Sequence, residues 1–228
     1  MRRGLLAGLF ASFAVLLPAT TAAQHGARPD INQPFLVNPD VARWKSAFEN
    51  QDREVYAKRS EILAAADVKP GMAIADVGAG TGLFTMMFAQ AVKPGGRVYA
   101  VDISQAFIEH IRQTAKAQGL DNVTAIVNDG TEVQLPEASV DLVFMSDVYH
   151  HFERPGQTLE SIRKALRARG RMVVIDYELI PGVTSPQRIQ HLRADKQTAI
   201  KEIEAAGFQL VEEKKLMREN YFVVFQRP

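Results

Sequence analysis

Short apolar runs and stretches of helical spacing alternate along the chain. The apolar runs, which have the length of buried strands, lie near residues 72–77, 97–102, 123–127, 140–145 and 171–176. Apolar residues recur at helical spacing near 82–92, 104–118 and 156–168. Strands that alternate with helices are typical of a parallel sheet covered on both faces. The pattern therefore predicts an α/β fold.

The last 35 residues change this rhythm. A helix is predicted near 195–206, and it ends at Gly207. Strand-like runs follow at 208–216 and 221–226, joined by a turn around 218–220. A parallel crossover needs a dozen or more residues, so these two strands should pair antiparallel. A dinucleotide-binding half would have continued with another strand-helix-strand unit instead.

The segment before the first strand has a different character. Residues 24–40 hold three prolines and little periodicity, which predicts an extended leader lying over the domain. Helical spacing begins near Val41, and its longest stretch covers 52–66. After the fifth strand, the polar stretch 181–191 is predicted to be a loop of the kind that covers a substrate.

The first 23 residues have the three-part layout of a secretory signal peptide. A basic start, Met1 to Arg3, precedes an apolar stretch at 5–17 and small residues up to Ala23. Thirteen apolar-to-small residues are few for a membrane-spanning helix, and an uncleaved anchor is the alternative. We therefore expect a signal peptide at 1–23, a leader at 24–40 and one domain at 41–228, and a periplasmic or secreted protein.

Composition excludes several classes of function. The 228 residues include 27 basic and 26 acidic side chains, and removing 1–23 deletes only Arg2 and Arg3, leaving 25 against 26. With basic and acidic residues nearly equal in number, the sequence shows no stripe of basic residues that would bind nucleic acid. The chain has no cysteine, so disulfides, a cysteine nucleophile and thiolate metal sites are excluded.

A glycine-rich loop follows the first predicted strand. Residues 74–82 read Ile-Ala-Asp-Val-Gly-Ala-Gly-Thr-Gly. Gly78, Gly80 and Gly82 carry no Cβ, so the backbone can bend sharply and lie against a ligand. Asp76 sits near the carboxyl end of the strand, where open α/β sheets bind ligands. The G-x-G-x-G spacing differs from the G-x-G-x-x-G of dinucleotide-binding loops.

This loop resembles motif I of the class I S-adenosyl-L-methionine (SAM) methyltransferases. The resemblance covers roughly 41–228. It implies a Rossmann-like seven-stranded methyltransferase fold, with a mostly parallel sheet, an antiparallel last strand and helices on both faces. The stretch 52–59 is similar to the entry helix of exported bacterial methyltransferase-like proteins. Tyr56 or Arg59 would there close over the SAM carboxylate, or would belong to a solvated helix face.

The resemblance also assigns roles around the cofactor. Asp76 would bind the SAM ammonium group, or would be a structural carboxylate bonded to loop amides. Asp102, at the end of the second strand, would accept the ribose hydroxyls; a helix cap is the alternative, although Ser104 is the better cap. Asp129 would bind the adenine amino group, or would belong to an ordinary turn. The full set of predicted cofactor residues is Asp76, Gly78, Ala79, Gly80, Gly82, Asp102, Ile103, Asp129 and Gly130.

The segment after the fourth strand resembles the part of small-molecule methyltransferases that lines the pocket beside the methyl group. It supplies the catalytic candidates Asp147, Tyr149, His150 and His151. One histidine could act as a base near neutral pH; alternatively, one caps a helix and the other packs under the cofactor. Farther along, His191 and Arg193 would reach the acceptor or lie at the surface.

A metal ion is not predicted. Asp147 and Asp176 could together hold a divalent ion, as in metal-dependent catechol methyltransferases, but no dedicated spacing supports this. The histidines of the same region have no recognised ligand spacing either.

The resemblance implies an enzyme that moves a methyl group from SAM to a small-molecule acceptor. No nucleic-acid partner and no stable membrane insertion after signal cleavage are expected, and the sequence does not give the oligomeric state. Two alternatives stay open: a catalytically idle periplasmic module that binds SAM or a nucleoside, and a nicotinamide-dependent reductase.

Overall fold

The computed structural model describes residues 29–182 and 184–228. The predicted signal peptide at 1–23, and the export that depends on it, lie outside the described residues. So does the start of the predicted leader, 24–28.

A seven-stranded sheet forms the centre of the molecule, in the order β3-β2-β1-β4-β5-β7-β6. The strands are β1 (Ala73–Val77), β2 (Arg97–Asp102), β3 (Val123–Val127), β4 (Val140–Ser146), β5 (Leu166–Tyr177), β6 (Gln209–Lys214) and β7 (Asn220–Gln226). The first five are parallel, and β7 runs antiparallel between β5 and β6. The predicted antiparallel pair is confirmed.

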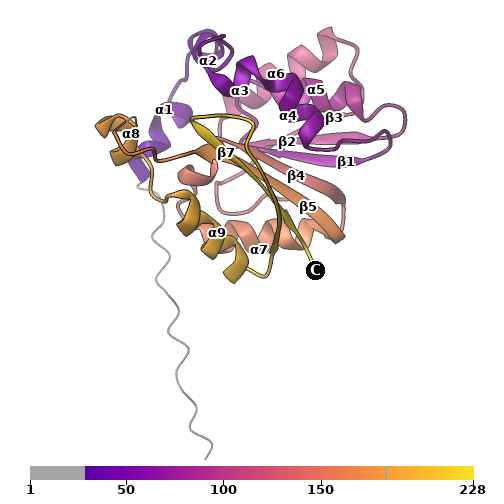
Figure 1. The fold of residues 1–228 in the computed structure, drawn as a ribbon. Coiled ribbons are helices and arrows are strands. Elements are labelled where there is room, and N and C mark those ends of the chain that lie inside the picture. The colour runs from indigo at the N-terminus through magenta and orange to yellow at the C-terminus, as the bar shows by residue number, and fades with distance from the viewer. Residues whose placement is uncertain (1–28, 183) are drawn as a thin grey trace, which may run out of the picture.

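Helices cover both faces of the sheet (Figure 1). On one face lie α3 (Glu54–Ala57), α4 (Arg59–Ala65), α5 (Leu83–Ala91) and α6 (Gln105–Ala117); on the other lie α7 (Pro155–Ala165) and α9 (Lys196–Ala205). Three further helices gather at one end of the sheet: α1 (Gln33–Leu36), α2 (Val41–Phe48) and α8 (Pro186–His191). The remaining elements are two short 3-10 helices, η1 (Pro29–Ile31) and η2 (Tyr149–His151).

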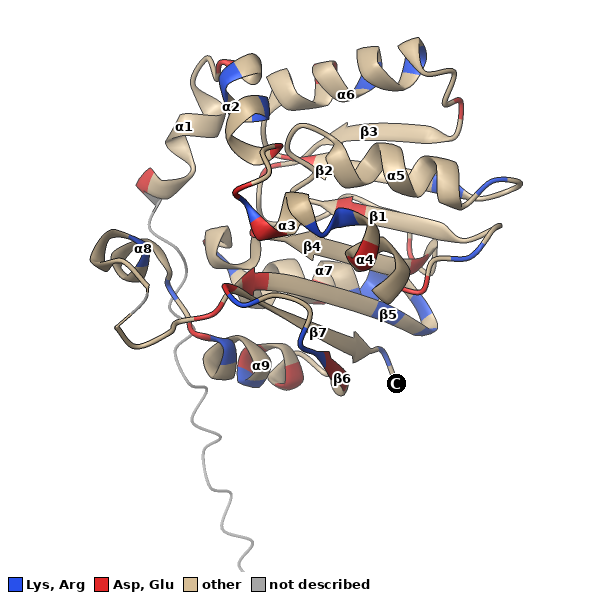
Figure 2. Ribbon diagram, turned by 45° about the horizontal axis from the view of Figure 1, so that its top comes forward, with Lys and Arg blue, Asp and Glu red and all other residues tan. Residues whose placement is uncertain are grey.

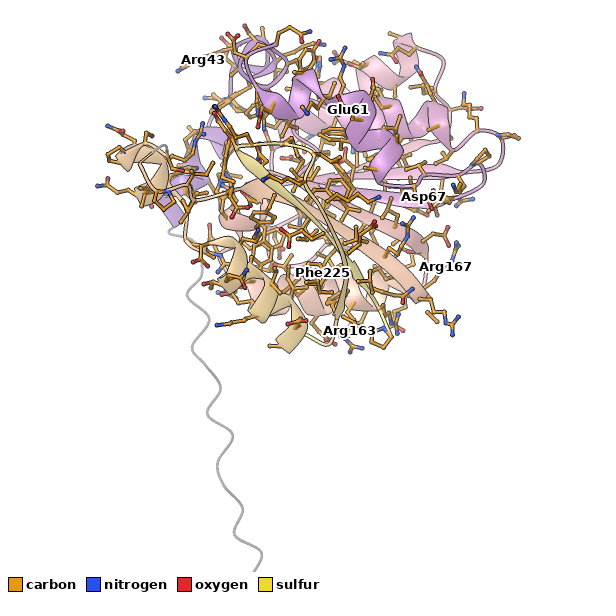
Figure 3. All side chains as sticks on the ribbon, viewed as in Figure 1. Arg43, Glu61, Asp67, Arg163, Arg167 and Phe225 are labelled. Carbon is orange, nitrogen blue, oxygen red and sulfur yellow. The ribbon has the colours of Figure 1, made fainter. Side chains whose placement is uncertain are left out.

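The alternation of side chains along β1 shows how the two cores are built. Ala73 and Ala75 pack with α7 and α9, whereas Ile74 packs with α4, α5 and α6. Successive side chains of a strand point to opposite faces, so Asp76 shares the face of Ile74. Side chains fill the space between sheet and helices, while Arg43 and Arg167 point outward (Figure 3).

Four predicted segments differ in detail. The helix expected over 52–66 is two short helices, α3 and α4, separated at Lys58. The helix expected over 156–168 ends at Ala165, because Leu166 is already extended and pairs with Val140. The stretch 181–191 contains α8, which Ser185 caps by accepting a hydrogen bond from Arg188. The described part of the leader is not extended throughout, because it contains η1 and α1.

Charges of both signs are interspersed over the ribbon (Figure 2). Across residues 29–182 and 184–228, every helix is too short or too polar to cross a membrane.

Candidate functional site

A cavity of about 930 Å³ opens at the carboxyl ends of the parallel strands. Strand order reverses between β1 and β4, and a crevice at this switch point is the usual ligand site of open α/β sheets. The glycine loop after β1, the ends of β2 and β4, and the segments containing α1, α2 and α8 all contribute to its wall. The predicted cofactor and acceptor segments therefore meet in one space.

The glycine loop has a backbone conformation that residues with a Cβ would adopt only with strain. Gly78 has φ +70°, and a Cβ there would lie 2.2 Å from Val148 Cγ2. The Gly78 and Ala79 amides both donate to the Val101 carbonyl, at 2.8 and 3.1 Å. Gly80 and Gly82 also have positive φ. The loop after β1 is thus packed directly against the loop after β4.

Asp76 is a buried carboxylate in the cavity wall, 4% exposed. Its Oδ2 accepts a hydrogen bond of 2.6 Å from Thr85 Oγ1. Burial raises the pKa of Asp76 to about 7, and the neighbouring Asp102 adds to this, although the Thr85 hydrogen bond acts the other way. No cationic side chain of the described residues forms an ion pair with this carboxylate.

Asp102 joins the glycine loop to the second strand. Its Oδ2 accepts from the Gly80 amide and its Oδ1 from the Ser104 amide, both at 2.8 Å. Burial raises its pKa to about 6, against the lowering effect of these hydrogen bonds. Ser104 caps α6 by accepting from the Phe107 amide, as expected from the sequence. Asp102 lines the cavity, and each carboxylate oxygen keeps a further lone pair for a ligand.

The third predicted cofactor segment also reaches the cavity, which Ile103, Asp129 and Gly130 all line. Asp129 is exposed and closes a turn in which its Oδ1 accepts from the Thr131 amide and hydroxyl, at 2.9 and 2.7 Å. These hydrogen bonds lower its pKa. Asp129 is therefore an ionised turn residue that also borders the cavity.

His150 is buried at the cavity floor and is bound by Asp176. Its backbone amide donates to Asp176 Oδ2 at 3.0 Å, and its Nδ1 lies 2.7 Å from Asp176 Oδ1. Burial lowers the pKa of His150, but the carboxylates of Asp176 and Asp147 raise it by more, and the net shift is upward. The sequence raised Asp176 only as a possible metal ligand with Asp147, without predicting a metal, and in the structure it is the partner of this imidazole.

His151 lies beside His150, with ring centroids 4.2 Å apart. Its Nδ1 is 3.0 Å from Asn32 Oδ1. Burial lowers the pKa of His151 to about 3, and the neighbouring histidines contribute to this, so the ring is neutral at physiological pH. His191, from the end of α8, completes a group of three imidazoles that line the cavity.

Asp147 lies where β4 turns toward η2, with a positive φ of 54°. It forms an ion pair with Arg53, and its Oδ1 accepts a hydrogen bond of 2.6 Å from Asn220 Nδ2. Burial raises the pKa of Asp147, and Arg53 opposes the shift. Asp147 and Arg53 both line the cavity, so this catalytic candidate is held as a paired, positioned carboxylate.

Tyr149 was predicted as a catalytic candidate, and its position contradicts this. The ring is 1% exposed and packs in the core that contains α7 and α9. Its hydroxyl donates to Glu202 Oε2 at 2.7 Å, and Arg193 stacks over the ring. Tyr149 and Arg193 are not among the cavity-lining residues of the described chain. Tyr149 and His150 are successive residues of η2, and their side chains enter different spaces, the core for Tyr149 and the cavity wall for His150.

An aromatic group from the N-terminal segment was missed from the sequence. Phe35, Trp44 and Phe48 line the cavity and contact one another, with ring centroids 4.8 Å apart for Phe35–Trp44 and 5.2 Å for Trp44–Phe48. Glu49 fastens this segment to the glycine loop, because Thr81 Oγ1 donates to its Oε1 at 2.8 Å. We call residues 29–53 the covering segment.

For Tyr56 and Arg59 of the entry helix, the structure favours the second of the two alternatives, a position on a helix face outside the cavity. Tyr56 and Arg59 are not among the described residues that line the cavity; Arg59 stacks on the Tyr56 ring instead. Arg53 lines the cavity in their place. It precedes α3, and helical periodicity over 52–66 gave no reason to separate it from its neighbours.

Comparisons with known proteins agree with this geometry. A family model described as a methyltransferase domain matches residues 68–222. A protein-L-isoaspartate O-methyltransferase of Ignicoccus hospitalis is 29% identical over 113 residues, 50% of this chain and 51% of that protein. A ubiquinone/menaquinone biosynthesis C-methyltransferase of Burkholderia cenocepacia is 27% identical over 125 residues, 54% and 51% of the two chains. The chain thus spans about half the length of these curated relatives.

A solved structure extends the likeness to most of the fold. The crystal structure of a SAM-dependent methyltransferase from Aquifex aeolicus superposes with a TM-score of 0.73. It covers 83% of this chain and 99% of its own, at 20% sequence identity. The predicted seven-stranded fold is confirmed.

Proposed function

The chain belongs to the methyltransferase domain family, and on this premise we propose that it transfers a methyl group from SAM to a small-molecule acceptor outside the cytosol. SAM, the methyl donor of this fold family, carries its methyl group on a sulfonium and supplies the reactivity itself. The protein has to bind the donor, position the acceptor and exclude water.

The observation that carries the proposal is the pair of buried carboxylates beside the glycine loop. A buried carboxylate is unfavourable unless it is paired, and the ammonium group of SAM would give Asp76 a cationic partner. Asp102 offers the free lone pairs that ribose hydroxyls need, and the Gly80 amide holds it in place. The residues present therefore fit this cofactor.

The extent and cover of the cavity support a small acceptor. The cavity continues from the glycine loop to His150, His191 and Arg188, so it has room beyond the carboxylates that would hold SAM. The covering segment lies over it and is fastened at both ends, by Asn32 and by Glu49. A covered cavity of about 930 Å³ is in the range of small-molecule sites, and interspersed charges do not favour nucleic acid.

Calorimetric titration with SAM tests the donor site. We expect Asp102→Ala to weaken SAM binding at least about tenfold, because it removes the charged acceptor of the ribose hydroxyls. Asp121→Ala is the matched control, since the Asp121 side chain is 93% exposed and belongs to a distant turn. Unchanged SAM affinity in Asp102→Ala, or NADH binding in place of SAM, would contradict the proposed donor.

Transfer itself is tested with methyl-labelled SAM and a panel of phenols, thiols, amines and quinols, with label on the small molecule as the expected product. Label on added protein instead would refute the small-molecule acceptor. Binding of SAM without transfer to any acceptor would favour the idle binding module.

Export is part of the proposal and rests on the sequence layout of residues 1–23. Fractionation of the native host should find a chain that begins near Gln24 in the periplasm or medium. A full-length protein in the cytosol would refute this part and leave the methyltransferase proposal intact.

A further inference from the structure

Three histidines meet at the acceptor side of the cavity. His150 and His151 come from η2, and His191 is the last residue of α8. One ring nitrogen of each lies within 4.8 Å of the others. The His191 ring centroid is 5.1 Å from that of His150 and 5.4 Å from that of His151. Residues 40 positions apart in the chain thus present three nitrogen ligands to one point.

Hydrogen bonds determine which ring nitrogen of His150 and of His151 is available to bind a ligand. The Asp176 carboxylate faces His150 Nδ1 at 2.7 Å and can only accept, so Nδ1 carries a proton. Asn32 Nδ2 donates to the His151 carbonyl and to Glu153 Oε1, at 3.1 and 3.0 Å. The Asn32 amide oxygen therefore faces His151 Nδ1 as an acceptor, and this nitrogen is protonated as well. Each ring keeps Nε2 as its ligand atom.

This is the arrangement found around metal-bound histidines. Such a histidine donates its other ring N–H to a carboxylate or carbonyl oxygen, which orients the ring and makes it a stronger ligand. Asp176 does this for His150, and the Asn32 amide does it for His151. A chance contact of aromatic side chains would not need hydrogen-bond partners that orient two of the rings. The arrangement of His150, His151 and His191 therefore points to a ligand site.

We propose that His150, His151 and His191 form a binding site for a divalent transition-metal ion, with Zn²⁺ as the fitting ion. Three imidazole nitrogens are the donor set of open zinc sites, in which the fourth position is left to water or a substrate. All three residues line the cavity, so the fourth position faces the space assigned to the acceptor. The chain has no cysteine to compete for the ion, and imidazole suits Zn²⁺ and similar transition-metal ions.

A small movement completes the site. Zn–N bonds of about 2.0–2.1 Å in tetrahedral geometry hold ligand atoms about 3.4 Å apart, which is closer than the 4.8 Å limit observed. Of the three residues, His191 is the exposed one. We expect small side-chain rotations, chiefly of His191, to bring the three nitrogens to this separation when the ion binds.

The test uses the full chain, treated with a chelator and titrated with ZnCl₂ in the absence of SAM. We expect one Zn²⁺ per chain and, with CoCl₂ instead, the visible absorption of tetrahedral Co²⁺. His191→Ala, an exposed position, should weaken Zn²⁺ binding at least about tenfold. His110→Gln, in α6 and outside the cluster, is the matched control and should leave the affinity unchanged.

Asn32→Ala is a second variant, because it leaves all three ligands in place. Loss of the partner that orients His151 should weaken Zn²⁺ binding about 10- to 100-fold, while circular dichroism reports that the fold is intact. Stoichiometry well below one ion per chain, or His191→Ala binding Zn²⁺ within about twofold of the parent chain, overturns the proposal. These readouts do not involve methyl transfer, so failure here leaves the donor site standing.

Discussion

Affinity for SAM should depend on pH through the two buried carboxylates. Burial raises the pKa of Asp76 to about 7 and that of Asp102 to about 6. In the proposed site, the SAM ammonium group would bind the ionised form of Asp76, and the ribose hydroxyls would bind the ionised form of Asp102. Acidification of the empty cavity therefore protonates the groups that the cofactor needs, and SAM affinity should fall with pH.

These pKa values give the size of the effect. Between pH 7.5 and 5.5, protonation of a group with pKa 7 weakens binding about 25-fold, and a group with pKa 6 adds about fourfold. Together they predict about a 100-fold loss of SAM affinity. The window ends at pH 7.5 because the SAM amino group itself loses its proton near pH 8.

Two ligands separate the contributions in a calorimetric titration. 5′-Methylthioadenosine keeps the ribose but lacks the ammonium group of the methionine part of SAM, so it should show only the fourfold loss from Asp102. Asp102→Asn with SAM should keep most of the loss from Asp76, somewhat below 25-fold, because the Asp102 charge itself adds to the raised pKa of Asp76. This variant also loses stability, about 1–3 kcal/mol, because one amide oxygen cannot accept from both Gly80 and Ser104. Asp121→Asn is the control for charge alone.

Stability of the ligand-free protein should change in the opposite direction. An acid whose pKa is raised in the folded state makes the ionised form unfavourable there, so folding stability increases as pH falls through that pKa. For Asp76 and Asp102 the contribution between pH 7.5 and 5.5 is about 3 kcal/mol. SAM affinity that stays constant within twofold over this range would refute the assignment of both carboxylates.

Two substitutions test the loop packing and the reassigned tyrosine. Gly78→Ala should lower the free energy of unfolding, measured in urea, by about 1–3 kcal/mol more than Gly119→Ala. Both glycines have positive φ, but only a Cβ at position 78 meets Val148. Equal losses of stability in the two variants would refute the steric argument. Tyr149→Phe should lower the free energy of unfolding by about 0.5–1.5 kcal/mol, because the hydrogen bond to Glu202 is lost. The turnover number should stay unchanged. A large fall in turnover with intact stability would restore Tyr149 as a catalytic residue.

The centre of the sheet was predictable because strands such as β1 and β4 are buried on both faces. Runs such as 72–77 and 140–145 are apolar at all but one position, and such runs can be recognised without any knowledge of neighbouring strands. The antiparallel order of β6 and β7 followed from the shortness of their connection. Asp76 and Asp102 could be expected to lie together in the cavity wall because the carboxyl ends of parallel strands meet at one edge of the sheet.

Contacts between distant segments were not predictable in the same way. Arg53 and Asp147 are 94 residues apart, and neither carries a local signal for the other. Tyr149 and His150 are adjacent in sequence and were assigned together, yet a tight 3-10 turn sends one into the core and the other into the cavity. His191 reaches the other two histidines from the end of α8. The sequence predicted a loop at 181–191, so it gave no reason to place His191 there.

The covering segment has a consequence for the order of folding. Asn32 binds the His151 carbonyl and Glu153 across 119 and 121 residues, and such long-range contacts form late, since a long loop must close first. We therefore expect residues 29–53 to reach their final place after the rest of the domain, although they leave the ribosome before it. Until then the cavity at the carboxyl ends of the strands would be open to solvent, and a ligand that enters at this stage would meet its binding groups before the chain closes over them.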